Sequence, residues 1–218
     1  MGNFFAYEGK VSIFFRKCTE LLMINTLWLI CCIPIITIGP ATTAMYYTIQ
    51  KSVLHNRGYV SREYFRSFKE NCKQGMIIWS IYLALGMWFV QDVYFFYNQL
   101  LAGNNIGILW FLFAVLIVIL ILLSIYTFAY LARFENTVLK TIKESFIIMF
   151  VHLWMNIKLI AILLIVALVG YLNFLFLLII PASAMFAICR SMERILRKYM
   201  SEEDKKLEYS LNLTEEES

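Results

Sequence analysis

Four stretches of this sequence contain no charged residue, and they restrict the chain to one broad class of fold. They are 30, 18, 40 and 31 residues long. About 20 apolar residues are enough for a helix to cross the hydrocarbon core of a bilayer. The sequence therefore predicts an all-α, polytopic transmembrane helix bundle. The four charge-free stretches are 21–50, 74–91, 93–132 and 159–189.

The composition agrees with a membrane location and argues against several other classes. Hydrophobic residues make up 61% of the chain and charged residues only 16%, whereas soluble domains carry about a quarter charged residues. A secreted disulfide scaffold, a disordered chain and a nucleic-acid-binding domain are all poor fits. The five cysteines form no CxxC pair and the two histidines are far apart, so we expect no metal site and no cofactor.

No catalytic motif stands out in the sequence. It has no Gly-rich phosphate loop, no HExxH, no GxSxG and no paired acids inside an apolar stretch. Asp92 is the only ionisable residue between 74 and 132. Helical rise places it near the outer interface, which favours a solvated carboxylate over a proton relay. We therefore expect a protein that is not an enzyme.

Hydropathy and charge together predict a single transmembrane domain over residues 1–200 with about five spans. Residues 201–218 hold seven acids against two lysines and are expected to form a mobile, acidic cytoplasmic tail. Five crossings place the amino terminus outside, which conflicts with the basic residues near it. A first segment that dips in and returns is the alternative that removes this conflict. The expected spans are 21–50, 76–97, 108–132, 150–171 and 174–195.

Two basic, amphipathic segments lie between the spans, at 61–72 and 138–150. Apolar residues follow one helical face of each segment, and the charges occupy the other face. Basic loops stay in the cytoplasm and are attracted to anionic headgroups. We therefore expect two cytoplasmic interfacial helices on an anionic inner leaflet, with the carboxyl terminus also in the cytoplasm. Their interfacial basic residues are Arg62, Arg66, Lys69, Lys140 and Lys143.

The first span contains the most unusual chemistry, because proline falls in its middle at Pro34 and again in Gly39-Pro40. The sequence predicts a helix broken at Pro34 and Gly39-Pro40, so that residues 34–40 join one helix at 21–33 to another at 41–50. A half-helix that begins at membrane depth presents free amides and a positive dipole end, as in transporters that bind polar or anionic solutes. The alternative is a kink in which Gly39, Ala41 and Ala44 pack against a neighbouring helix. The candidate binding residues are Thr37, Gly39, Pro40, Thr42 and Thr43.

Several motifs in fixed order resemble the YesL family, which is the domain of unknown function 624. They are Asn25-Thr26-Leu27-Trp28, Pro34 to Ala41, Gly58-Tyr59, Phe65 to Asn71 and Arg133-Phe134-Glu135-Asn136. The resemblance covers about residues 3–199 and implies a multi-pass protein of the bacterial cytoplasmic membrane, with a link to carbohydrate uptake. It brings no catalytic residues. The motif residues expected to matter for structure are Asn25, Trp28, Pro34, Asn71 and Asn136.

Two functional hypotheses follow from the residues and the resemblance. The first is a non-enzymatic accessory or regulatory partner of a carbohydrate uptake system, which binds permease or sensor subunits through its helices. The second is a small oligomeric transporter with its solute site at the broken first helix. Neither hypothesis involves a nucleic acid.

Overall fold

The computed structural model describes residues 10–56, 58–172 and 180–200, and every regular element within them is helical. This confirms the all-α expectation. A π-helical turn, η2 (Ile49–Leu54), follows α2 directly, and α3 is by far the longest element at 42 residues. The main helices are α1 (Lys10–Cys31), α2 (Ile38–Thr48), α3 (Val60–Leu101), α4 (Trp110–Leu131), α5 (Val138–Val151), α6 (Leu153–Leu172) and α7 (Ile180–Leu196).

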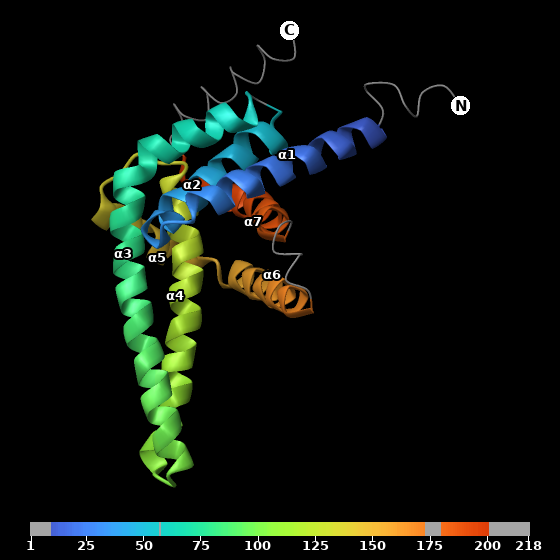
Figure 1. Ribbon diagram of the computed structural model, residues 1–218. Coiled ribbons are helices and arrows are strands. Elements are labelled where there is room, and N and C mark those ends of the chain that lie inside the picture. Colours follow the sequence, from blue (N-terminus) through green and yellow to red (C-terminus); the bar gives the residue numbers. More distant parts are fainter. Residues whose placement is uncertain (1–9, 57, 173–179, 201–218) are drawn as a thin grey trace.

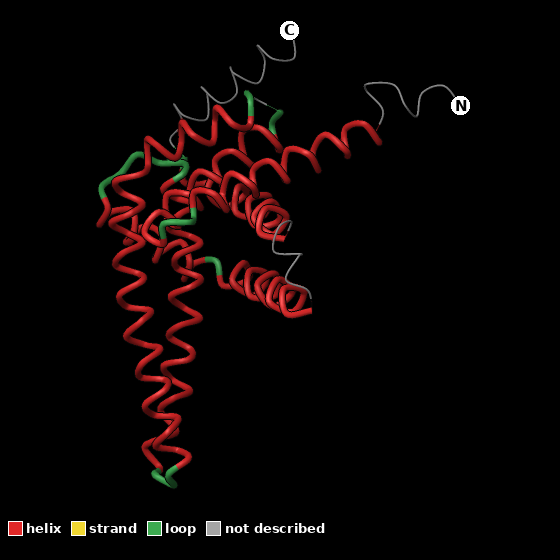
Figure 2. The backbone as a smooth tube through the Cα atoms, in the orientation of Figure 1, coloured by secondary structure: helices red, strands yellow, loops and turns green. Residues whose placement is uncertain are grey.

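Most of the helices form two regions that differ in shape, and α5 and α6 belong to neither. We call the first region the cap; it consists of α1, α2, η2, the start of α3 (60–74) and α7. The second is the hairpin, in which the rest of α3 (75–101) runs antiparallel to α4 and projects away from the cap (Figure 1). A short turn and the 3-10 helix η3 (Asn105–Leu109) close the far end of the hairpin (Figure 2).

Within the described residues, three segments are long and apolar enough to cross a membrane: Val60–Leu101, Asn105–Leu131 and Leu153–Tyr171. They correspond to the spans predicted at 76–97, 108–132 and 150–171. The other two predicted spans, 21–50 and 174–195, fall on α1 with α2 and on α7, which are not among these segments. The coarse expectation of a multi-helix membrane protein therefore holds, whereas the count of five spans stays a prediction.

The predicted break in the first segment is confirmed, although the second helix starts at Ile38, three residues before the predicted Ala41. Helix α1 ends at Cys31, just before Pro34, and a 3-10 turn, η1 (Ile35–Thr37), leads into α2. Pro40 lies in the first turn of α2. Proline is tolerated there because the first amides of a helix have no intrahelical partner. The Gly39-Pro40 pair therefore begins a helix and does not interrupt one.

The two amphipathic segments are both helical, but they are built differently from each other. Residues 61–72 are the first turns of α3 and continue without interruption into the hairpin, so they are not a separate helix. The segment at 138–150 is a helix of its own, α5. The first residues of the predicted span at 174–195 lie outside the described residues, and the whole tail at 201–218 lies outside them too. The positions of these helices at a membrane interface stay predictions.

Burial also differs between the two regions. The largest fully buried side chains come mainly from the cap and from the helix ends beside it, and they include Tyr46, Tyr64 and Tyr126. Along the hairpin, by contrast, large apolar side chains face outward, among them Trp88, Phe95 and Phe111. In a bilayer such side chains contact lipid, so the exposed apolar surface of the hairpin carries no cost there.

Candidate functional site

The three threonines of the predicted binding segment use their hydroxyls within their own stretch of chain. Thr37 Oγ1 lies 2.6 Å from the carbonyl oxygens of both Cys31 and Pro34 and shares its one proton between them. Thr42 and Thr43 each donate to the carbonyl four residues earlier, at 2.7 and 3.1 Å. A threonine hydroxyl has one proton to donate. These side chains therefore retain acceptor capacity only.

Gly39 and Pro40 are buried against α3. A Cβ atom on Gly39 would lie 2.5 Å from the carbonyl oxygen of Gly75, and one on Gly75 would lie 2.9 Å from the nitrogen of Pro40. Ala41 and Ala44 are both fully buried. This geometry matches the packing alternative, in which small residues allow two helix backbones to approach closely. Solute binding at Thr37, Gly39, Pro40, Thr42 and Thr43 stays a prediction.

The motif residues anchor helices to one another over short and long distances. Asn25 is completely buried in α1, and its Oδ1 accepts from the backbone amide of Ala182 at 3.2 Å. Trp28 Nε1 donates to Thr42 Oγ1 at 3.3 Å, across the turn that contains Pro34. Asn71 Nδ2 bonds the Ser67 carbonyl, and Asn136 Nδ2 bonds the Tyr130 hydroxyl. Asn25 therefore joins α1 to α7 and Trp28 joins α1 to α2, whereas Asn71 and Asn136 make local bonds.

A buried ion pair connects the end of the hairpin to α7. Arg133 Nη2 lies 2.7 Å from Glu193 Oε1, and the two side chains are 13% and 9% exposed. The hydroxyl of Tyr46, on α2, donates to Glu193 Oε2 at 3.4 Å. Three segments far apart in the sequence therefore meet at one acidic side chain. A buried charge of this kind is tolerated only when its partner is in place.

The pairing of Arg133 with Glu193 was missed at the sequence level. One signal was available, because Glu193 lies on the helical face that also carries Cys189, Met192 and Leu196, all of which are buried. An acid on an apolar face of a helix indicates a partner elsewhere. The sequence does not say which of the many basic residues provides it.

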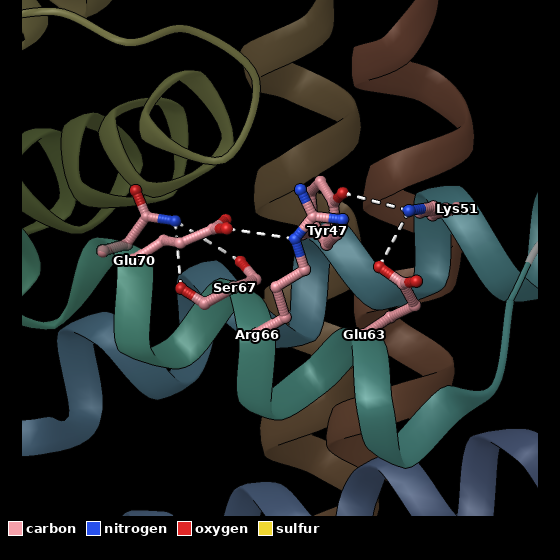
Figure 3. A network of polar contacts seen from close by, with 7 residues as sticks. Tyr47, Lys51, Glu63, Arg66, Ser67 and Glu70 are labelled. Atoms are coloured by element: carbon pink, nitrogen blue, oxygen red, sulfur yellow. Dashed lines mark hydrogen bonds and ion pairs between the residues drawn. The ribbon is translucent and has the colours of Figure 1, made fainter.

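A second polar cluster joins η2 to the start of α3 (Figure 3). Lys51 Nζ donates to Glu63 Oε2 at 2.8 Å and to the Tyr47 hydroxyl at 3.4 Å. Glu63 is buried, whereas Arg66 and Glu70, one turn further along α3, form an exposed pair at 3.0 Å. Burial lowers the pKa of Lys51, but the hydrogen bonds to Glu63 and Tyr47 raise it by more. The amine therefore stays charged at neutral pH.

The sharp turn before α3 brings Lys51 and Glu63 together. Asn56 and Gly58 both have positive φ, at 53° and 71°. A side chain at Gly58 would also meet the Glu63 carboxylate, with its Cβ 2.8 Å from Oε1. Glycine is therefore required there for two reasons, backbone conformation and space.

The predicted interfacial residues Arg62, Arg66, Lys69, Lys140 and Lys143 all have exposed side chains. The first three lie on the start of α3 and the last two on α5. Among the described residues no three His, Cys, Asp or Glu side chains are placed to hold a metal ion. The five cysteines, all within the described ranges, are unpaired thiols.

Comparison with known proteins gives one match. The family described as "Protein of unknown function, DUF624" matches residues 21–93, a region that runs from α1 through the break, η2 and Lys51–Glu63 to the middle of the hairpin. No curated protein and no solved structure matches the chain. The matched region contains Asn25, Trp28, Pro34 and Asn71, four of the motif residues. Residues 21–93 of this chain are therefore similar to the DUF624 family.

Proposed function

We propose that this chain is a non-enzymatic, multi-pass protein of a bacterial cytoplasmic membrane that acts as an accessory partner of a carbohydrate uptake system. The observation that carries the proposal is the projecting hairpin. Beyond the cap, α3 and α4 pack mainly on each other, and their outward apolar side chains are left for lipid or for another membrane protein. A permease or sensor subunit that packs against this surface is the partner we propose.

The arrangement of polar groups also supports a binding role over catalysis or transport. Buried polar side chains of the cap form hydrogen bonds with one another or with the backbone. Asn25, Tyr46 and Glu63 are examples. The threonine hydroxyls at the helix break donate internally. Such groups stabilise one arrangement of helices. A rigid cap that displays a long apolar hairpin suits a subunit that docks within the membrane.

Site-specific photocrosslinking in native membranes tests this proposal. A photoreactive amino acid at Trp88 or Phe111, both exposed on the hairpin, should capture a membrane subunit of a sugar permease or its sensor. The matched control carries the same amino acid at Arg62, which is exposed on the cap. Capture from the hairpin positions and not from Arg62 supports the proposal. Recovery of the uncrosslinked chain alone from every position argues against it.

A further inference from the structure

A groove of about 510 Å³ runs along the hairpin between α3 and α4. Its lining residues recur every three or four positions along each helix, so they share one helical face, and all of them are uncharged. Trp79 lies at one end and Gln91 at the other, so the groove extends for about 18 Å along α3 at 1.5 Å per residue. Gly86 lies between them and widens the groove, because a Cβ there would meet only Leu120, at 3.7 Å.

The groove adjoins a smaller chamber at its cap end. This chamber has a volume of about 100 Å³ and shares Trp79 and Ser124 with the groove. Thr42 and Tyr46 of α2 and Met185 of α7 line it further inside. No lining residue of the chamber carries a charge. A long apolar groove therefore ends in a small space that is lined partly by hydroxyl groups.

Hydrogen bonding inside the molecule uses up the donors of this chamber. The indole N–H of Trp79 donates to a backbone carbonyl at 2.8 Å, and so does the hydroxyl of Ser124 at 2.7 Å. Thr42 and Tyr46 also donate within the protein. Thr42 accepts one bond, from Trp28, and no described residue donates to Ser124. What the chamber offers a ligand is therefore oxygen lone pairs at Ser124 and Thr42.

We propose that the groove and the chamber together bind a single-chain neutral lipid that ends in a hydroxyl, such as a long-chain alcohol. The hydrocarbon chain lies between α3 and α4, and the terminal hydroxyl donates to Ser124, which lines both spaces, whereas Thr42 already accepts from Trp28. A phosphate headgroup does not fit this chamber, because it needs donors or a cation and the chamber provides neither. This inference is independent of the proposed function, since it concerns a ligand and not a partner subunit.

Competition labelling of the full-length protein in nanodiscs tests the proposal. The probe is hexadecanol that carries a diazirine in its chain, and mass spectrometry locates the labelled residues. We expect labels on the groove residues of both α3 and α4. Unlabelled hexadecanol should compete about fivefold better than hexadecyl methyl ether, which is the effect of one net hydrogen bond. Hexadecyl phosphate should compete more weakly than hexadecanol.

Two pairs of variants separate this site from ordinary contact with bulk lipid. Gly86→Leu fills the groove and should abolish labelling, whereas Ala84→Leu, at an exposed position outside the lining residues on the same helix, should not. Ser124→Ala should remove the preference for the alcohol over the ether. Ser80→Ala is its control, because Ser80 makes a similar bond to backbone but does not line the groove.

Three results would overturn the proposal. They are equal competition by the alcohol and the ether, unchanged labelling in Gly86→Leu, and labels spread equally over α5 and α6. If Gly86→Leu does not fold, the comparison of Ser124→Ala with Ser80→Ala decides alone. An unchanged preference for the alcohol in Ser124→Ala would then reject the site.

Discussion

The cap and the hairpin of this protein are held together by different kinds of contact. The cap buries charged side chains and pairs them: Glu193 with Arg133 at the end of the hairpin, and Glu63 with Lys51. The hairpin relies on apolar and aromatic contact between neighbouring helices, such as the stacked rings of Phe96 and Phe113 at 5.3 Å. Lipid chains can solvate the apolar side chains of the hairpin but not the charged groups of the cap. The cap therefore tolerates fewer substitutions than the hairpin.

The largest expected effect comes from breaking the buried ion pair of the cap. Glu193→Gln leaves Arg133 charged in a buried site, and removing one partner of a buried pair costs about 3–5 kcal/mol. We expect a large drop in the temperature at which the detergent-purified protein loses its monodisperse elution peak. Replacing both partners by apolar residues, Arg133→Met with Glu193→Leu, should recover part of that loss.

The exposed pair on α3 is the control for this experiment. Arg66 Nε lies 3.0 Å from Glu70 Oε1, which is a salt-bridge distance, but both side chains are more than half exposed. Exposed i,i+4 pairs contribute about 0.3–0.5 kcal/mol. Glu70→Gln should therefore leave the unfolding temperature nearly unchanged. Equal losses in Glu70→Gln and Glu193→Gln would mean that burial is not what distinguishes the cap.

The second effect concerns the junction of the two regions. Gly39→Ala places a Cβ 2.5 Å from a backbone oxygen of α3, and overpacking of this kind costs about 1–3 kcal/mol. Gly86→Ala, on the hairpin, meets only ordinary van der Waals contact and should be neutral or slightly stabilising, because alanine favours helix. Thermal unfolding in detergent compares the two. A neutral Gly39→Ala would show that the two backbones do not approach this closely.

The third effect is smaller and tests the polar cluster of Figure 3. Lys51→Met keeps an unbranched side chain one atom shorter but leaves Glu63 without its ammonium partner, at a cost of about 1–3 kcal/mol. Because Lys51 is partly exposed, we expect the lower end of this range. Protease accessibility of the 55–60 turn should rise as well. Unchanged protection of this turn would argue against a role of the pair in holding η2 to α3.

The smallest effect is expected in the hairpin itself. Phe113→Leu removes the ring that contacts Phe96 and Phe89 but keeps an apolar side chain at this position. Aromatic pairs contribute about 0.5–1.5 kcal/mol beyond their burial. The change in unfolding temperature should be well below that of Glu193→Gln. A loss as large as that of Glu193→Gln would overturn the contrast between cap and hairpin.

Much of the helical layout was predictable because its signals are local. The spans at 76–97, 108–132 and 150–171 follow from apolar runs, and α5 follows from its helical stripe. Pro34 marked the end of α1 because proline disrupts a helix wherever it falls in the interior. The start of α2 is predicted three residues too late, at Ala41, because Gly39-Pro40 is tolerated both before a helix and within its first turn. The structure places that start at Ile38.

The sequence by itself determined that this chain is helical, apolar and suited to a bilayer, because charge-free length and periodicity need no knowledge of distant residues. Tertiary structure decided which groups meet. It placed Gly39 on Gly75, Glu193 on Arg133, and Thr42 in the same chamber as Ser124. Each of these contacts depends on the relative position of two helices. That position is set by side-chain packing over the whole cap and is not written in any one segment.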